Sequence, residues 1–297
     1  MSFSTNVKSE LCSALVSRPV IEAECYGMLF CSRSFSFNKI LFQTGSREIA
    51  EHFISLLRHT FDITAFLSVG GDKKPTFRVC IESDIDRKRI MHRLGYSVDS
   101  ELIIKTERFK AEGSVKAFVK GVFLATGNVS DPEKEYRIDF SFKTSIEAEQ
   151  FVNLLASKGI KLSVCKRDNR YITYTKNSTT VEDILTFMGA GTETLNLIGV
   201  KIFKNVRNKL NRQNNCETSN ILKTANAAYI QTKAIEKLKE SGKLVSLPEE
   251  LVEVANLRLQ NPEMSLSELS RLSKTKLTRS GINHRIKKLL EIADSIK

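Results

Sequence analysis

Apolar positions recur with helical spacing in two stretches that each contain a glycine. Residues 114–131 carry Gly121 inside such a run, and residues 23–34 carry Gly27 inside a similar one. Glycine in a helix interior costs about 1 kcal/mol relative to alanine, so a packing reason is expected, and the close passage of another backbone supplies one. The pattern therefore predicts two helices that pack against each other through Gly27 and Gly121.

The elements after each of these helices also repeat. A strand, a helix, two strands and a closing helix come next in both cases, which gives the order α-β-α-β-β-α twice. The first set of elements is predicted at 35–44, 47–61, 63–69, 76–81 and 84–94. The second set is predicted at 136–142, 145–157, 160–166, 171–176 and 180–188. We interpret residues 20–190 as a duplicated α/β unit; a chance succession of ordinary elements is the alternative.

The pattern becomes almost entirely helical beyond Gly191. An amphipathic helix is predicted over 193–210, a polar, Asn-rich break over 211–220, and a second helix over 221–239. With few glycines and prolines, this segment is expected to be an articulated connector and not a flexible linker.

The last fifty residues have the pattern of a helix-turn-helix domain. Pro248 marks the start of a first helix, and Asn261-Pro262 ends it. Ser265 and Glu268 match a capping box ahead of a short helix over 266–272. A final helix is expected over 278–292, with a core-facing stripe. That stripe consists of Ile282, Ile286, Leu289 and Ala293.

Charge is concentrated in the same part of the chain. The net charge is +12, and residues 201–297 hold 19 Lys/Arg against 10 Asp/Glu. Such a balance favours an anionic partner, most often nucleic acid, although a solvated basic surface is the alternative interpretation.

Residues near the final helix are the main candidates for binding double-stranded DNA. The cations at its start suit phosphates, whereas Ser280, Asn283, His284 and Lys287 on its outer face suit base edges. For His284 a surface histidine without a role is an equal alternative. The full candidate set is Ser265, Lys274, Lys276, Thr278, Arg279, Ser280, Asn283, His284, Arg285, Lys287 and Lys288.

A second basic stretch lies within the duplicated unit. Residues 158–176 carry six Lys/Arg against one acid, interleaved with tyrosines, and are secondary DNA-binding candidates. The candidates are Lys166, Arg167, Arg170, Tyr171, Tyr174 and Lys176. An exposed strand edge guarded by lysines against aggregation explains the pattern equally well.

Several classes of protein are disfavoured by what the chain lacks. The N-terminus has no apolar signal-peptide core, and no run approaches the length of a membrane span. The six cysteines form no CxxC pair or Cys/His cluster, so we expect buried thiols in a reducing cytosol and no metal or cofactor. A cytoplasmic, nucleoid-associated monomer is the expectation, since internal duplication provides pseudo-symmetry within one chain.

The glycine-bearing helices resemble those of a known family. Residues 119–127, VKGVFLATG, resemble the LAGLIDADG helix of homing endonucleases, and residues 25–33, CYGMLFCSR, resemble a degenerate first copy. The resemblance implies a saddle with two central helices whose terminal acids bind catalytic metal. Those acids are replaced by Ser32 and Thr126, which are poor ligands for a hard cation such as Mg²⁺. We therefore expect a retained scaffold without nuclease chemistry.

Four further segments resemble the WhiA family of bacterial DNA-binding regulators. They are residues 121–136, 211–238, 247–269 and 277–289, which read GVFLATGNVSDPEKEY, NRQNNCETSNILKTANAAYIQTKAIEKL, LPEELVEVANLRLQNPEMSLSEL and LTRSGINHRIKKL. The resemblance implies an α+β fold, with a duplicated LAGLIDADG homing-endonuclease-like saddle followed by an all-α helix-turn-helix domain. It also implies a transcriptional regulator, not an enzyme, with a role in sporulation or in cell division and chromosome segregation.

The sequence predicts six segments, and two alternative functions remain open for the duplicated unit. The segments are 1–19 for an N-terminal helix, 20–95 for the first repeat, 96–111 for a linker, 112–190 for the second repeat, 191–245 for the connector and 246–297 for the helix-turn-helix domain. One alternative is an active endonuclease that uses displaced acids such as Asp131 or Glu133. The other is a saddle that binds a small ligand or another regulatory protein.

Overall fold

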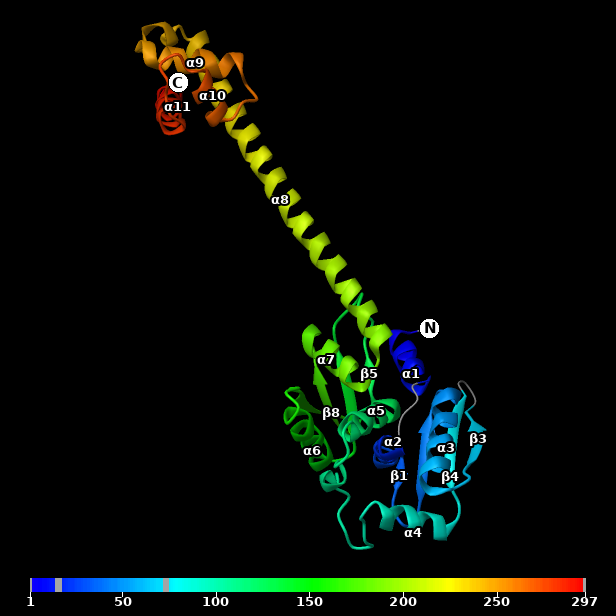
Figure 1. Ribbon diagram of the computed structural model, residues 1–297. Coiled ribbons are helices and arrows are strands. Elements are labelled where there is room, and N and C mark those ends of the chain that lie inside the picture. The colour runs from blue at the N-terminus through cyan, green and yellow to red at the C-terminus, as the bar shows by residue number, and fades with distance from the viewer. Residues whose placement is uncertain (1, 14–17, 72–74, 296–297) are drawn as a thin grey trace. The chain divides into compact units, whose positions relative to one another are not determined.

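The computed structural model describes residues 2–13, 18–71 and 75–295 (Figure 1). The chain divides into two compact units, Met1–Lys204 and Asn205–Lys297. In the described part of the chain, no helix combines the length and the apolar content that a membrane crossing requires.

The first unit contains two halves with the same order of elements. The first half consists of α2 (Arg18–Phe30), β1 (Ser34–Phe35), β2 (Ile40–Thr44), α3 (Arg47–Phe61), β3 (Phe66–Gly70), β4 (Thr76–Ile81) and α4 (Asp84–Arg93). The second half consists of α5 (Ser114–Thr126), β5 (Asn128–Val129), β6 (Ile138–Phe142), α6 (Ser145–Ala156), β7 (Ser163–Arg167), β8 (Arg170–Thr175) and α7 (Ser178–Met188). The duplication predicted from the element order is therefore present.

Each half forms a four-stranded antiparallel sheet. The strand orders are β1-β2-β4-β3 and β5-β6-β8-β7, so the two sheets have one topology. The predicted order α-β-α-β-β-α merged β1 with β2 in one run over 35–44 and missed β5, because strands of two residues are too short to show a period of two. Apolar side chains from one face of each sheet pack on its helix: Phe42 lies 4.6 Å from Phe53 of α3, and Phe140 lies 4.9 Å from Phe151 of α6, between ring centroids.

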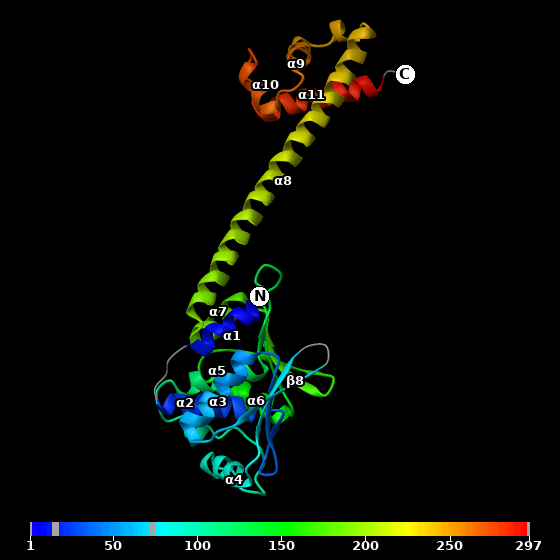
Figure 2. The ribbon, with the colours of Figure 1, turned by 90° about the vertical axis from the view of Figure 1, so that its right-hand side faces the viewer.

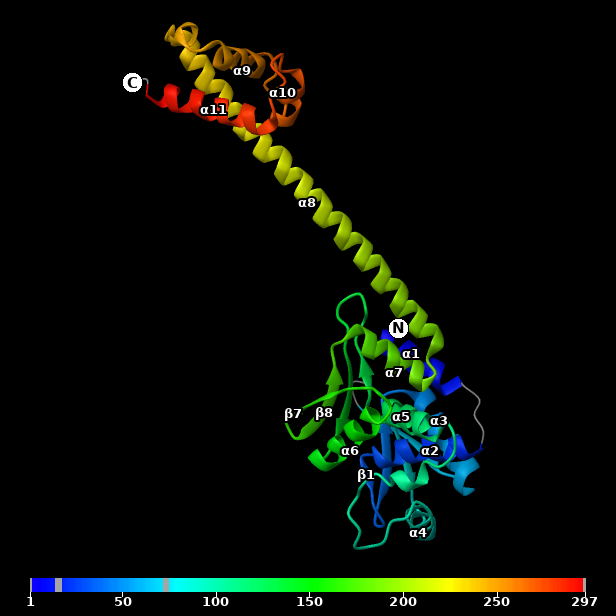
Figure 3. The ribbon, with the colours of Figure 1, turned by 60° about the vertical axis from the view of Figure 1, so that its left-hand side comes forward.

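Helices α2 and α5 lie side by side at the centre of the first unit (Figures 1 and 3). A Cβ atom on Gly27 would lie 2.3 Å from the carbonyl oxygen of Phe118, and one on Gly121 would lie 2.1 Å from that of Glu24. Both distances are far inside van der Waals contact, so only glycine permits this approach. The predicted packing through the two glycines is confirmed.

Segments outside the repeats cover this core. Helix α1 (Phe3–Ser13) buries Val7 and Leu11 against it, while residues 14–17 of the expected N-terminal helix lie outside the described residues. The expected linker over 96–111 contains a short 3-10 helix, η1 (Thr106–Arg108), none of whose residues is buried. Tyr96 and Ile104 of this linker belong to the core, and the Tyr96 hydroxyl lies 2.7 Å from that of Tyr26 in α2.

Helix α8 (Gly191–Glu240) is continuous, so the break predicted over 211–220 is wrong. Asparagine lowers helix propensity by only about 0.7 kcal/mol relative to alanine, and residues 200–240 contain no glycine or proline to end a helix. A side-chain hydrogen bond between Gln213 and Glu217, 3.0 Å long, adds support one turn apart within the polar segment.

The second unit packs three short helices on the end of α8. After a 3-10 turn, η2 (Lys243–Ser246), come α9 (Glu249–Gln260), α10 (Leu266–Leu272) and α11 (Arg279–Asp294), shown in Figure 2. Ile235 and Leu238 of α8 join Leu251 of α9 and Leu289 of α11 in one apolar cluster. Val254, Leu269, Ile282 and Ile286 form a second cluster among α9, α10 and α11. The predicted three-helix layout is confirmed.

The cysteines carry no disulfide, and all six are free. Cys12, Cys25, Cys31 and Cys80 are buried or half-buried, as expected for small apolar residues. The same expectation is wrong for Cys165 and Cys216, which are exposed, because both lie on elements that the core does not cover.

Candidate nucleic-acid interface

Helix α11 presents a buried stripe and an exposed polar face. Ile282, Ile286, Leu289 and Ala293 are at most 2% exposed, which confirms the predicted core-facing stripe. Ser280, His284 and Lys287 are exposed on the other side, and Asn283 is half-buried beside them. The helix therefore offers a solvent-facing surface of the polarity expected for a base-reading helix.

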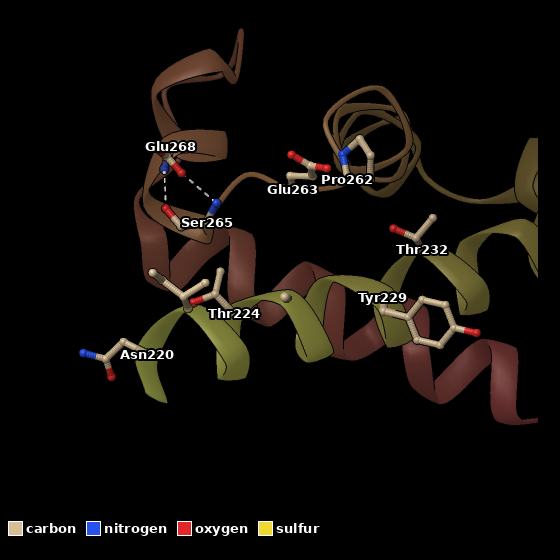
Figure 4. Close-up of a pocket in the computed structure, with 10 residues that line it drawn as sticks. Asn220, Thr224, Tyr229, Thr232, Pro262, Glu263, Ser265 and Glu268 are labelled. Atoms are coloured by element: carbon tan, nitrogen blue, oxygen red, sulfur yellow. Dashed lines mark hydrogen bonds between the residues drawn. The ribbon is translucent and has the colours of Figure 1, made fainter. Parts of the chain in front are cut away.

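Two of the candidate hydroxyls serve as helix caps. The Ser265 side chain accepts a hydrogen bond from Glu268 N, and Glu268 accepts one of 2.7 Å from Ser265 N, which completes the predicted capping box (Figure 4). Thr278 accepts from Gly281 N in the same way at 3.1 Å. These bonds fix where α10 and α11 begin, so both residues support the surface of the domain through their caps.

The turn between α10 and α11 is anchored by an acid that the sequence did not single out. Glu253 of α9 accepts hydrogen bonds from Ser273 Oγ at 3.1 Å, Lys274 N at 2.9 Å and Thr275 Oγ1 at 3.1 Å. Desolvation favours the neutral form of Glu253, but these hydrogen bonds outweigh it and lower the pKa of its carboxyl. The anchored turn places Lys274 and Lys276 before α11, with Lys276 in the left-handed region at φ 50°.

Five cations around α11 are exposed and form no ion pair with another described residue. They are Lys274, Lys276, Arg279, Lys287 and Lys288. Unpaired cations on one surface produce a positive potential suited to a polyanion.

Arg285 differs from the other cationic candidates near α11, since it forms an ion pair within the protein. Its Nη2 lies 2.5 Å from a carboxylate oxygen of Glu250 in α9, and its Nη1 donates to the carbonyl oxygen of Gly281 at 3.3 Å. The geometry indicates that Arg285 positions α11 against α9, which alters the role predicted for it.

The six secondary candidates in the first unit do not share one face. The register pairs Lys166 with Tyr171 on the helix-covered side of the sheet, and Arg167 with Arg170 on the open side.

The remaining candidates differ in their surroundings. Tyr174 lies on the open side, where the Arg137 guanidinium stacks 5.0 Å from its ring. Lys176 follows β8 as an exposed residue. Arg170 donates to Ser141 Oγ at 2.9 Å, whereas the exposed Arg167 forms no ion pair with a described residue.

The positions of the missing acids do not fit a divalent cation. Ser32 is buried and its hydroxyl donates to the carbonyl oxygen of Met28 at 2.9 Å, and the Thr126 hydroxyl donates to that of Val122 at 3.3 Å. The ammonium group of Lys143 donates to the carbonyl oxygen of Ser32 at 2.6 Å, which makes this end of α2 electropositive. Metal binding there would need carboxylate oxygens.

The alternative acids, Asp131 and Glu133, are not arranged to hold a metal ion either. Asp131 and Glu133 are exposed in the turn between β5 and β6, where Asp131 accepts a hydrogen bond from Glu133 N at 2.9 Å. Among the described residues, no group of three His, Cys, Asp or Glu has an arrangement suited to holding a metal ion.

A buried charge cluster lies between α2 and α5 that the sequence interpretation missed. Glu24 lies 2.9 Å from Lys120 and 2.6 Å from the Nε2 atom of His52, and both Glu24 and Lys120 are at most 4% exposed. The Glu24–Lys120 contact is an ion pair without directional hydrogen-bond geometry. The sequence does place each of them in an apolar helical run close to a glycine, three residues before Gly27 for Glu24 and directly before Gly121 for Lys120.

An apolar groove lies beside the capping box of α10 (Figure 4). It has a volume of about 680 Å³ and is lined by α8 residues, including Ile221 and Tyr229, and by Pro262 and Glu263 of the loop before α10. Thr224 of α8 stands at its border near Ser265.

Comparison with known proteins identifies the family. The "Probable cell division protein WhiA" of Clostridium perfringens is 33% identical over 321 residues, which cover 100% of this chain and 99% of the relative. The chain belongs to the WhiA family. The WhiA LAGLIDADG-like domain model matches residues 115–207, and the WhiA C-terminal HTH domain model matches residues 210–293. A WhiA of the same description from Ruminiclostridium cellulolyticum is 32% identical over 100% of this chain and 98% of its own length.

A solved WhiA structure has the same fold. The crystal structure of full-length DUF199/WhiA from Thermatoga maritima aligns with a TM-score of 0.63 and 23% identity, over 99% of this chain and 98% of that one. The predicted class, a LAGLIDADG-like saddle followed by a helix-turn-helix domain, is therefore confirmed.

Proposed function

We propose that this WhiA-family chain is a sequence-specific DNA-binding transcriptional regulator. The observation that carries the proposal is the exposed face of α11, where cations without ion-pair partners surround side chains able to reach base edges. In this proposal Lys274, Lys276, Arg279 and Lys288 contact phosphates, and Ser280, Asn283, His284 and Lys287 read the major groove. Relatives named as probable cell division proteins support a role in cell division, with chromosome segregation or sporulation as related roles.

The saddle acts in this proposal as a scaffold without nuclease activity. Cleavage of a phosphodiester by two metal ions needs anionic ligands at the site. The supporting observation is the chemistry at the two helix ends, where Ser32 and Thr126 bond to backbone carbonyl oxygens and Lys143 contributes a positive charge. Purified protein incubated with plasmid DNA and Mg²⁺ is expected to leave the DNA intact, and cleavage would refute this part of the proposal.

The DNA-binding part is tested with full-length protein and labelled duplexes. Lys287→Ala is expected to weaken binding by fivefold or more, since one good base contact contributes about 1–3 kcal/mol. Lys239→Ala is the matched control: Lys239 is an exposed lysine of α8 that forms no ion pair with a described residue. Equal affinity of both variants and the unmodified protein would count against α11 as the reading helix.

A further inference from the structure

A small polar groove in the second unit contains a buried guanidinium without a counter-ion. The groove has a volume of about 210 Å³ and lies between α8 and the starts of α10 and α11. Arg258 of α9 lines it, although the residue is only 1% exposed. Its Nη1 donates to the carbonyl oxygens of Asn261 and Met264, at 3.3 and 2.6 Å, whereas its Nε has no hydrogen-bond partner in the described structure.

This arrangement leaves a positive charge only partly compensated. Burial of an ion costs several kcal/mol unless a partner of opposite charge is present. Arg258 forms no ion pair with any described residue, and two carbonyl dipoles are its only bonded acceptors there. The groove above it is therefore a region where an anion is electrostatically favoured.

Two more cations reach the same groove from different helices. Lys223 of α8 and Arg279 of α11 both line it, both are exposed, and neither pairs with an acid among the described residues. Thr224 and Gln231 of α8 add a hydroxyl and an amide, and no acidic residue is found in the described lining. Guanidinium, ammonium and hydroxyl donors around one concave site are the groups that bind phosphate oxygens.

We propose that this groove binds one phosphate of the DNA backbone, with Arg279 and Lys223 as direct donors and Arg258 supporting the potential from below. The inference rests on the proposed function, because Arg279 belongs to the first turn of α11 and a duplex along α11 passes beside it. It extends the DNA contact beyond the helix-turn-helix to α8. A free phosphate ligand would use the same chemistry, so the experiment separates the two sources.

The first measurement is the salt dependence of DNA binding by the full chain. A short mixed-sequence duplex is titrated over a range of salt concentrations with the unmodified protein, Lys223→Ala, Lys287→Ala and Lys239→Ala. Loss of one phosphate contact reduces the slope of log K against log salt by about 0.9, so Lys223→Ala is expected to show that reduction. The control Lys239 lies on the same helix about 24 Å away at 1.5 Å per residue, and its variant is expected to keep the full slope.

The outcomes separate the inference from the function on which it rests. If Lys287→Ala weakens binding but Lys223→Ala keeps both the affinity and the salt slope of the unmodified protein, the groove assignment fails while the function of α11 stands. If neither variant binds more weakly, the proposed function fails as well.

The second measurement observes the groove directly through the Nε–H group of Arg258 by ¹H–¹⁵N NMR. Duplex DNA is expected to shift this signal in the unmodified protein and to shift it less in Lys223→Ala. Inorganic phosphate at matched ionic strength is expected to leave it in place. A shift with inorganic phosphate and none with DNA would assign the groove to a small phosphate ligand and overturn the proposal.

Discussion

Gly27 and Gly121 occupy equivalent places in the two halves, and the backbones of α2 and α5 meet at them. A Cβ on Gly27 would lie 3.2 Å from the carbonyl carbon of Gly121, and backbone atoms of Phe118 and Val122 would be closer still. Since these obstacles are backbone and not the ends of flexible side chains, the helices must separate to admit even a methyl group.

We therefore expect Gly121→Ala to lower the free energy of unfolding of the first unit by about 1–3 kcal/mol, even though alanine favours a helix. Urea unfolding followed by circular dichroism measures the change. Gly199→Ala is the matched control, because Gly199 is also helical and a Cβ there meets nothing within 4 Å. That control is expected to be neutral or slightly stabilising; equal effects of both substitutions would contradict the close-approach interpretation.

Removal of one charge from the buried cluster is expected to lower the free energy of unfolding of the first unit more than removal of both charges of the ion pair. Lys120→Met leaves the Glu24 carboxylate with only His52 and should destabilise the first unit by roughly 3–5 kcal/mol. The double variant Glu24→Gln/Lys120→Met should recover much of that loss. Lys116→Met, on the exposed side of the same helix, is the control, and the same unfolding experiment compares all three.

The ion pair of Arg285 and Glu250 predicts a stability effect separate from DNA binding. Arg285→Ala is expected to lower the free energy of unfolding of the second unit by no more than about 1 kcal/mol. The effect is small because the Glu250 side chain is 67% exposed, so solvent screens the pair. The DNA affinity of Arg285→Ala should change less than that of Lys287→Ala. A double-mutant cycle with Glu250→Ala measures the coupling, and zero coupling would show that the contact is without energetic effect.

The Glu253 carboxylate makes the turn before α11 sensitive to acid. Its folded-state pKa is lowered, so its contribution to stability is complete above the unfolded value of about 4.3 and is lost as the pH falls through the folded pKa. In unmodified protein, amide exchange at Lys274 and Thr275 should therefore accelerate relative to the rest of the domain at acid pH. Glu253→Gln should exchange fast at neutral pH as well.

The control for that experiment is Glu263→Gln, which changes an exposed acid of the neighbouring loop. In this variant the amides of Lys274 and Thr275 are expected to exchange slowly at neutral pH. At acid pH their exchange should again accelerate relative to the rest of the domain. Slow exchange in Glu253→Gln at neutral pH would show that the turn holds without this anchor.

Local chemistry made most of the elements predictable from the sequence. The capping box of Ser265 and Glu268 and the stripe from Ile282 to Ala293 each depend on residues close together in the chain. The glycines of α2 and α5 pack on distant residues, but each was recognisable because it interrupts an apolar helical run. The break expected within α8 failed because asparagines only weaken a helix, whereas glycine or proline would end it.

The features that sequence reasoning missed depend on distant residues. Glu253 reaches the turn at Ser273 only after α9 and α10 have packed, and Arg258 reaches the groove beside Lys223 and Arg279 in the same way. His52 meets Glu24 across a helix pair. No spacing along the chain encodes such contacts, although a charge on the buried face of an apolar helix indicates that a partner is required.

The charge cluster at the centre of the saddle makes the two halves chemically different where they meet. The acid comes from the first half and the base from the second, and 94 positions separate equivalent sites, so Phe118 stands where Glu24 would recur and Tyr26 where Lys120 would. Two copies of the first half would enclose a pair of carboxylates with no ammonium between them. At this contact the two halves are therefore complementary and not interchangeable, and a pairing of two identical halves would not reproduce the ion pair.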